Sequence, residues 1–227
     1  KIAGRTEKEV YKAIGLPYIP PEIRQNEGEI EVALKNQLPK LLERKDIKGD
    51  LHCHSKPDGL KHSNFGKESI KKIAKRAIEL GYEYIGISDH TKFLKIDDGL
   101  DENGLLKQQE IIKKINQEIK SKRKPGDKPF KILHGCEANI LNDGSIDIKN
   151  EVLEKLDYVI AGIHSSFKMT KEEMTNRIIT AMKNPNVDII SHPTGRLIDR
   201  RDEYKMDFDK ILKVAKETGT ILEINSS

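Results

Sequence analysis

The sequence predicts an α/β protein built around a parallel sheet, and three observations support this. From residue 46 onward, short apolar runs typical of strands alternate with amphipathic segments typical of helices. Strands that follow one another through helical crossovers pair in parallel, in either a doubly wound sheet or a closed barrel. Six such strand units fall within residues 46–227, and so many in one domain favour the barrel.

Each expected element rests on a local pattern. The strand-type runs are short and apolar, and they cover residues 49–53, 84–88, 130–136, 158–163, 187–191 and 220–225. The helical segments repeat apolar residues every three to four positions, and they cover residues 67–80, 105–122, 171–183 and 208–218.

The first 45 residues differ from the rest. Thr6 and Glu9 have the spacing of a capping box, so a short helix is expected from there to Gly15, whose glycine suits a helix end. The prolines within residues 16–21 prevent its continuation, and a charged, weakly helical stretch follows to Leu42. This segment is expected to be an appendage or linker without a catalytic cluster.

Composition narrows the function classes. The 227 residues carry 41 Lys and Arg against 37 Asp and Glu, a net charge of +4, which is compatible with nucleic acid but does not argue for it. No apolar run is long enough to cross a bilayer, and the first residues lack a signal-peptide pattern. The two cysteines, Cys53 and Cys136, are too few for a disulfide framework and are expected to be small buried residues. A cytoplasmic protein is expected.

The expected strand at residues 49–53 leads into a pair of histidines, His52 and His54. Side chains alternate along a strand, so both imidazoles point to the same face and could converge on a metal ion. Taken alone, the motif is a weak signal, because paired histidines also occur by chance on solvated strands.

Further candidate ligands stand at the ends of the following strands, and they are His90, Glu137, His164 and His192. Parallel barrels and open α/β sheets build their active sites at the carboxyl ends of strands, so these side chains should reach one rim. A single histidine at a strand end is more often a hydrogen-bonded loop residue, but repetition at successive strands indicates a metal centre. His134 lies inside its strand and is expected to be structural or solvent-exposed.

These motifs resemble, in order, those of the polymerase and histidinol phosphatase (PHP) superfamily. They read Asp50-Leu51-His52-Cys53-His54-Ser55, Asp58-Gly59, Ser88-Asp89-His90, Gly135-Cys136-Glu137, Gly162-Ile163-His164-Ser165 and Ser191-His192-Pro193. The segments at residues 163–167 and 192–196 are similar to the PHP domain of bacterial and archaeal family X DNA polymerases. Residues 6–11 and 15–22 resemble the end of the polymerase region in those enzymes and its linker to the PHP domain.

The resemblance implies a distorted (β/α)7 TIM-like barrel at residues 46–227, preceded at residues 1–45 by the end of a polymerase region and a linker. It implies up to three divalent metal ions. The first would be held by His52, His54 and Glu137, the second by Asp58 and His90, and the third by Glu137, His164 and His192. The loop from His54 to Asp58 is one residue shorter than usual in the family. Imidazole and carboxylate ligands suit manganese, zinc or iron.

The implied activity is 3′–5′ exonuclease or a related phosphoesterase reaction on DNA 3′ ends, with a polymerase region in the same polypeptide. Divalent ions would polarise the phosphate and activate a water, so no protein nucleophile is needed. Arg196, four residues past His192, is the candidate for binding a substrate phosphate, with a solvated surface arginine as the alternative.

The printed chain ends at residues 223–227, before the Asp-x-His motif that the family carries on its last barrel strand. We therefore expect a fragment of a longer enzyme whose barrel lacks its last strand and whose metal cluster is incomplete. Two alternatives stay open. One is a histidinol-phosphatase-like phosphomonoesterase, and the other is a non-catalytic PHP barrel that stabilises a polymerase.

Overall fold

The computed structural model describes residues 3–56, 66–93 and 99–225 of the chain. Contacts divide the chain into two compact units, Lys1–Asp46 and Ile47–Ser227. The first unit contains helices α1 (Glu7–Ala13) and α2 (Glu29–Leu34) and the 3-10 turns η1 (Pro21–Ile23) and η2 (Arg44–Asp46). The second contains the strands and the remaining helices, and all of the strand-end histidines.

Helix α1 begins where the sequence predicted it. The Thr6 side chain accepts a hydrogen bond from the Glu9 backbone N–H, and the helix ends at Ala13, with Ile14 as its C-cap and Gly15 next at a positive φ of 77°. The Glu9 carboxylate accepts from the backbone N–H of Arg5, one residue before the position that a capping box requires. The start and end of the helix are confirmed, and the second half of the capping box is replaced by this neighbouring contact.

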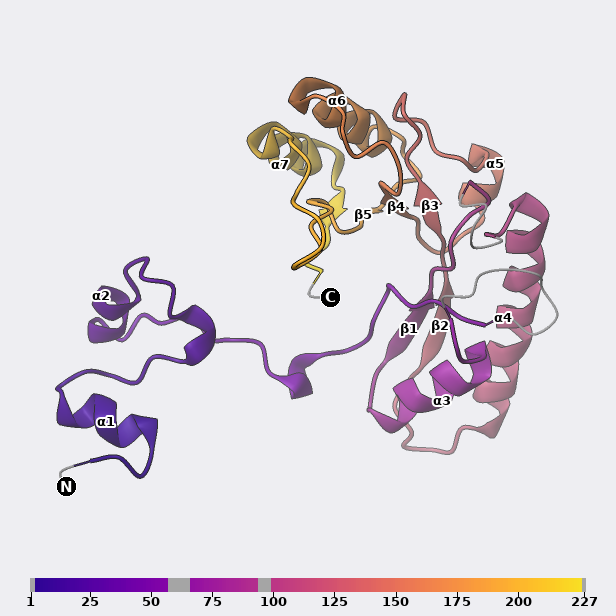
Figure 1. Ribbon diagram of the computed structural model, residues 1–227. Coiled ribbons are helices and arrows are strands. Elements are labelled where there is room, and N and C mark those ends of the chain that lie inside the picture. The colour runs from indigo at the N-terminus through magenta and orange to yellow at the C-terminus, as the bar shows by residue number, and fades with distance from the viewer. Residues whose placement is uncertain (1–2, 57–65, 94–98, 226–227) are drawn as a thin grey trace. The chain divides into compact units, whose positions relative to one another are not determined.

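Parallel strands form the inner layer of the second unit (Figure 1). They are β1 (Tyr84–Ile87), β2 (Lys131–His134), β3 (Glu137–Asn139), β4 (Ile160–Gly162), β5 (Ile189–Ile190) and β6 (Ile221–Leu222). β1 pairs with β2, the other four pair in the order β3, β4, β5, β6, and a parallel bridge from His90 to Glu137 joins the two sets. Neighbours in space are therefore neighbours along the chain, whereas a doubly wound sheet reverses its order at a switch point.

The strand expected at residues 49–53 is absent from the assigned strands, and an irregular extended segment takes its place. Its carbonyls at Lys48, Asp50 and Cys53 accept hydrogen bonds from the β1 side, the last two from Gly86 (2.7 Å) and Ser88 (2.9 Å). Between these two hydrogen bonds the segment advances three residues, from Asp50 to Cys53, while the β1 chain advances two, from Gly86 to Ser88. This mismatch, as in a β-bulge, breaks the regular hydrogen-bond ladder. The segment still lies along β1 and brings its histidines to the carboxyl end.

The strand expected at residues 130–136 is shorter and ends at His134 as β2, and Glu137 opens the separate strand β3 instead of following a strand end. The chain keeps its partner across the break, because Gly135 and Glu137 donate backbone hydrogen bonds to Ile87 (2.8 Å) and Asp89 (3.1 Å). On the other side, Ile160 donates to Cys136 (2.9 Å). Glu137 consequently sits deep in the sheet, with 1% of its surface exposed.

Helices line the outside of the strands in an arc that follows chain order (Figure 1). They are α3 (Ile70–Glu79), α4 (Glu102–Lys122), α5 (Asn150–Leu153), α6 (Lys171–Met182) and α7 (Phe208–Thr218). The short helix α5 was not expected from the sequence. Within the described ranges, no helix is long and apolar enough to cross a membrane.

Alternating strand residues pack against two different layers. Ala161 and Ile190 belong to the cluster that the outer helices cover, while their neighbours Ile160 and Ile189 pack with Tyr158 in a separate cluster. Adjacent residues of a strand point to opposite faces, so this second cluster marks the inner face of the sheet. Both faces are therefore buried, as is usual for parallel strands.

Candidate metal centre

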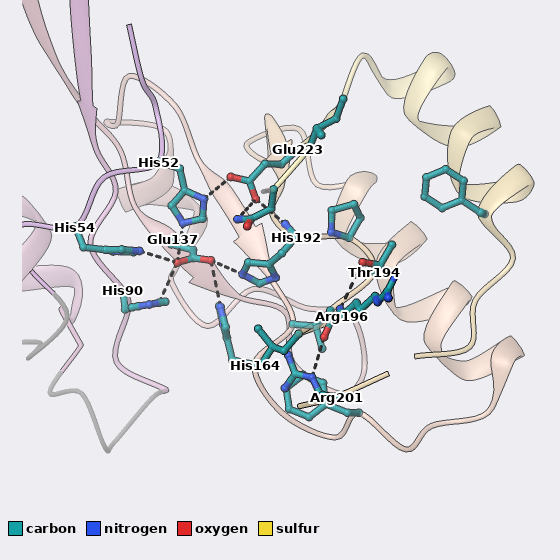
Figure 2. Close-up of a pocket in the computed structure, with 18 residues that line it drawn as sticks. His52, His54, His90, Glu137, His164, His192, Thr194, Arg196, Arg201 and Glu223 are labelled. Atoms are coloured by element: carbon teal, nitrogen blue, oxygen red, sulfur yellow. Dashed lines mark hydrogen bonds and ion pairs between the residues drawn. The ribbon is translucent and has the colours of Figure 1, made fainter. Parts of the chain in front are cut away.

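Glu137 lies at the centre of five histidines in the second unit, as Figure 2 shows. The imidazoles come from the segment before β1, from the chain just after β1, and from positions two residues past β4 and β5; they are His52, His54, His90, His164 and His192. The sequence predicted that these residues share the rim formed by the carboxyl ends of the strands, and the structure brings all six together.

Each oxygen of the Glu137 carboxylate faces its own set of imidazoles. Oε2 lies 3.0 Å from His52 Nε2, 3.4 Å from His54 Nε2 and 3.2 Å from His90 Nδ1. Oε1 lies 3.2 Å from His164 Nε2 and 2.9 Å from His192 Nε2, and it also accepts a hydrogen bond from Ser191 (3.0 Å). A carboxylate surrounded on both oxygens in this way has the arrangement of a bridging ligand.

The spacing of these atoms fits shared coordination. Two ligand atoms bound to one ion at about 2.1 Å lie about 3.0 to 3.4 Å apart at octahedral or tetrahedral angles. Within the described residues, two groups have donor atoms within 4.8 Å of one another, His52 with His54 and Glu137, and His90 with Glu137 and His164. The first group matches the set expected from the sequence, and the second joins His90 to His164, which had been expected in separate sets.

Burial and hydrogen bonds together set the protonation of the cluster. Burial alone would raise the pKa of Glu137, but hydrogen bonds with His164, His192 and His52 lower it well below its usual value. Burial lowers the pKa of His54, and it lowers that of His90 to about 3. Neutral imidazoles are the form that binds metals, so these two rings are ready to act as ligands.

His52 differs because it lies between two carboxylates. Its Nε2 faces Glu137 and its Nδ1 lies 2.6 Å from Glu223 Oε1. Burial would lower its pKa, but the hydrogen bonds to the two glutamates outweigh it and raise the pKa to about 10. A metal bound at Nε2 would have to displace a proton there, while Glu223 keeps the one on Nδ1.

Glu223 is a residue of this site that the sequence analysis missed. Besides contacting His52, its Oε2 accepts a hydrogen bond from the backbone N–H of His192 (2.7 Å). Burial raises its pKa, but hydrogen bonds from His52 and His192 lower it to about 2. His192 has a positive φ of 29°, an unfavourable conformation for a histidine, and the bond to Glu223 helps to hold it. One carboxylate thus orients two candidate ligands from opposite ends of the strand order.

A second buried carboxylate, Asp89, holds Ser55, the residue after His54. It accepts hydrogen bonds from the Ser55 hydroxyl (2.7 Å) and backbone N–H and from Gln108 of α4 (2.6 Å). Burial raises its pKa to about 6, although these hydrogen bonds act in the opposite direction. The Gln108 amide oxygen in turn lies 3.1 Å from His134 Nε2, so His134 is a buried structural residue, one of the two roles expected for it.

Asn139 of β3 orients His164. Its side-chain oxygen lies 2.7 Å from His164 Nδ1, and its amide nitrogen donates to Asp147 (2.9 Å) and Thr91 (3.0 Å). Metal-binding histidines commonly donate a hydrogen bond from their second ring nitrogen to such a partner, which fixes the orientation of the ring and its tautomer. His52 and His164 both have this kind of support, from Glu223 and Asn139 respectively.

The remaining expectations are located as follows. Arg196 lines an open cavity of about 720 Å³ beside the histidine cluster. Asp58 lies outside the described residues. Cys136 is buried and Cys53 half-buried, and burial raises the pKa of Cys53 to about 12, so it stays a neutral thiol at physiological pH.

The family model of the PHP domain matches residues 50–227, and that of the DNA polymerase beta thumb matches residues 1–25. The chain belongs to the PHP domain family. The resemblance inferred from the strand-end motifs is thereby confirmed, and a polymerase-type segment precedes the PHP domain.

Two curated relatives with different names share much of this sequence. "DNA polymerase/3'-5' exonuclease PolX" of Bacillus subtilis (strain 168) is 41% identical over 222 residues, covering 98% of this chain and 36% of the relative. A "probable phosphatase" of Acetivibrio thermocellus is 31% identical over 180 residues, covering 78% of this chain and 64% of that protein. This chain therefore spans about a third of the first relative and less than two thirds of the second.

A solved PHP-type structure shares the fold. It is the histidinol phosphate phosphatase of Lactococcus lactis, whose crystal structure is a complex with zinc, L-histidinol and phosphate. The match has a TM-score of 0.51 at 22% identity and covers 78% of this chain and 73% of that one. At this identity the likeness concerns the fold.

Proposed function

We propose that this chain is a metal-dependent phosphodiesterase, the 3′–5′ exonuclease domain of a family X DNA repair polymerase. The observation that carries the proposal is the buried Glu137 carboxylate between five imidazoles, at the end of the strands where α/β enzymes do their chemistry. The 41% identity to a polymerase and exonuclease over 98% of the chain supports the choice of DNA as substrate.

The residues present fit divalent ions. We propose His52, His54, His90, Glu137, His164 and His192 as ligands, with Asp58 as a further ligand, for up to three manganese, zinc or iron ions. The zinc in the histidinol phosphate phosphatase structure supports a metal of this class. Bound ions would supply Lewis acidity, which polarises a phosphate and makes water nucleophilic near neutral pH.

The chain's own residues then have separate roles. Glu137 would bridge ions and hold them close together, while Glu223 and Asn139 orient His52 and His164. Arg196, exposed at the cavity edge, is a candidate phosphate-binding residue. No side chain is needed as nucleophile in this scheme.

We also propose that strands β1 to β6 are part of a distorted seven-stranded barrel at residues 46–227, with residues 1–45 as the end of a polymerase region and linker. The sequential strand order supports this, and so does the curvature that brings His52 within 2.6 Å of Glu223, near opposite ends of that order. DNA would reach the site through the polymerase region of the same polypeptide.

The test is manganese-dependent degradation of a 3′-recessed DNA primer by this chain, with metal content measured on the same preparation. Degradation should disappear in His164→Ala and His192→Ala, while Lys183→Ala, on the surface beyond α6, serves as a control. Bound metal without degradation in the wild type would contradict the nuclease assignment and favour a barrel that only stabilises a polymerase.

A second candidate is a phosphomonoesterase of the histidinol phosphatase type. The phosphatase relatives and the shared fold favour it. Histidinol phosphate and p-nitrophenyl phosphate separate the two functions, because the exonuclease should hydrolyse these monoesters far more slowly than the DNA primer.

A further inference from the structure

One wall of the cavity beside the histidine cluster is formed by residues other than the candidate metal ligands. Much of that wall comes from the loop after β5, which contributes Arg196, Leu197 and Arg201, and α7 adds Phe208. At about 720 Å³ the cavity is far larger than a phosphate ion. It therefore has room for a phosphoryl group together with the larger molecule that carries it.

Arg201 is held rigidly in this wall, as Figure 2 shows in part. Its guanidinium carbon lies 4.0 Å from the centre of the Phe167 ring, and its Nε donates a hydrogen bond to the Gly195 carbonyl (2.8 Å). The Phe167 ring stacks in turn on Tyr204, with the ring centres 6.4 Å apart. A tight turn fixes the backbone here, because Leu197 and Arg201 exchange backbone hydrogen bonds of 2.9 Å across the three residues between them.

The outer edge of this guanidinium is available. Over the described residues, the Nε bond to Gly195 is its one hydrogen bond, and no carboxylate pairs with it. The terminal nitrogens Nη1 and Nη2 remain, and they form the fork that binds two oxygens of a phosphate. The side chain of Arg196, by contrast, is exposed and has no hydrogen bond or ion pair with the described part of the chain, so binding would have to order it first.

We propose that Arg201 is the principal binding residue for the phosphoryl group of the substrate in this site. The inference rests on the proposed function and deepens it, because it names the residue that takes the phosphate. The shared chemistry of the ligand is a phosphate mono- or diester, carried either by a nucleotide or by a small metabolite. Phe167 and Gly195 act as positioning residues that orient the guanidinium.

A purely structural role is the competing explanation. Phe167 follows His164 by three residues and Gly195 follows His192 by three, so Arg201 also ties together the loops behind two candidate ligands. A clamp of this kind would act on metal binding and stability, whereas a phosphate-binding residue acts on substrate affinity. The two roles therefore predict different measurements.

The experiment uses the full chain loaded with manganese and compares Arg201→Met with Arg200→Met. Methionine keeps much of the packing on Phe167 but removes the charge, and Arg200 is an exposed arginine of the same loop that does not line the cavity. Inorganic phosphate, thymidine 5′-monophosphate and p-nitrophenyl phosphate serve as probes in binding titrations. Metal content and melting temperature are measured on every sample.

We expect Arg201→Met to bind inorganic phosphate and thymidine 5′-monophosphate about 10- to 100-fold more weakly, the range of a charge-assisted hydrogen-bond pair, at unchanged metal content. Arg200→Met should bind like the wild type. A larger loss with thymidine 5′-monophosphate than with p-nitrophenyl phosphate identifies a nucleotide as the source of the phosphate, and the reverse identifies a small metabolite.

Phosphate affinity within twofold of the wild type in Arg201→Met overturns the proposal. If Arg201→Met loses metal, Arg201→Lys decides the matter. If Arg201→Lys binds metal normally and binds phosphate with an affinity between that of Arg201→Met and the wild type, the proposal is supported. If Arg201→Lys also loses metal, the proposal is overturned and Arg201 has the structural role. Because these titrations measure binding and need no turnover, they test the proposal even if the wild type degrades no DNA. Full DNA degradation with unchanged KM in Arg201→Met overturns the proposal and leaves the proposed function standing.

Discussion

Glu137 is the residue on which the candidate metal centre depends, because five imidazoles converge on its two oxygens. We expect Glu137→Gln to lose bound metal and at least about 100-fold of any hydrolytic activity, since the amide removes the bridging charge and turns one oxygen into a donor. Metal analysis of purified protein and the primer assay measure both effects. Glu118→Gln, on the exposed face of α4, is the control, and normal metal content in Glu137→Gln would disprove the bridging role.

Glu223 acts through His52 and the His192 backbone. The His52 pKa of about 10 means that the metal-free protein holds a proton on this ring at pH 8, which metal binding at Nε2 must release. Titration with Mn²⁺ in buffers of different ionisation enthalpy should therefore show close to one proton released from His52.

In Glu223→Gln the proton release should fall, because one of the two carboxylates whose hydrogen bonds raise the His52 pKa is replaced by a neutral amide. Metal affinity should drop about 10- to 100-fold, as for other partners that orient a metal-binding histidine. Glu217→Gln, exposed near the end of α7, should leave both quantities unchanged. Equal proton release in Glu223→Gln and the wild type would contradict this account of His52.

Local pattern was enough to find the histidines but not their supports. His52, His54, His90, His164 and His192 stand out because imidazoles recur where strand-type runs end, and their convergence follows from parallel pairing alone. Glu223 directly follows the strand residues Ile221 and Leu222, and its local sequence does not distinguish it from a surface residue at the end of a strand. Its role depends on the curvature of the whole set of strands, which no local pattern records.

At the scale of elements, Tyr158 connects the irregular segment before β1 to the sheet. Its hydroxyl donates to the Leu51 carbonyl (2.6 Å), and its ring fills the space that Gly135 and Gly86 leave open. A Cβ on Gly135 would overlap Tyr158 Cζ, so a glycine is needed where the chain passes between β2 and β3. The position of His52 is therefore fixed by an element over a hundred residues away.

Tyr158→Phe should keep the ring and lose that hydrogen bond. We expect the free energy of unfolding to fall by about 1 to 2 kcal/mol, because the Leu51 carbonyl loses its buried donor. Urea denaturation measures the loss, and metal affinity should weaken in parallel as His52 gains freedom. Tyr84→Phe is the control for the loss of a tyrosine hydroxyl. If Tyr84→Phe lost as much stability as Tyr158→Phe, the hydrogen bond to Leu51 would contribute nothing specific.

Element boundaries also show where the sequence prediction reached its limit. The run from 130 to 136 reads as one strand because most of its residues are apolar, yet β2 ends at His134 and β3 begins at Glu137, although the chain keeps its backbone hydrogen bonds to the β1 side. The segment at residues 49–53 has the composition of a strand, but its bulge against β1 removes the regular ladder. Both differences arise from pairing with distant strands, and composition carries no information about that.

At the scale of the whole second unit, the candidate ligands come from nearly every part of the sheet. They belong to the segment before β1, the chain after β1, β3, and the chain after β4 and β5. Ions that bind them would link these parts in the folded state, while the unfolded chain would offer far fewer ligands at once. Metal binding should therefore stabilise the fold as well as equip the site.

The size of that stabilisation can be predicted from linkage. At a free metal concentration 100 times the dissociation constant, a single site adds about 2.7 kcal/mol. For a domain of this size, one kcal/mol corresponds to about 2 to 4 °C, so chelation with EDTA should lower the melting temperature by about 5 to 10 °C. In Glu137→Gln, which should hold no metal, the same chelator should leave the melting temperature unchanged. An equal decrease in both proteins would mean that EDTA acts elsewhere, and no decrease in the wild type despite complete metal removal would mean that the histidine cluster is stable without ions.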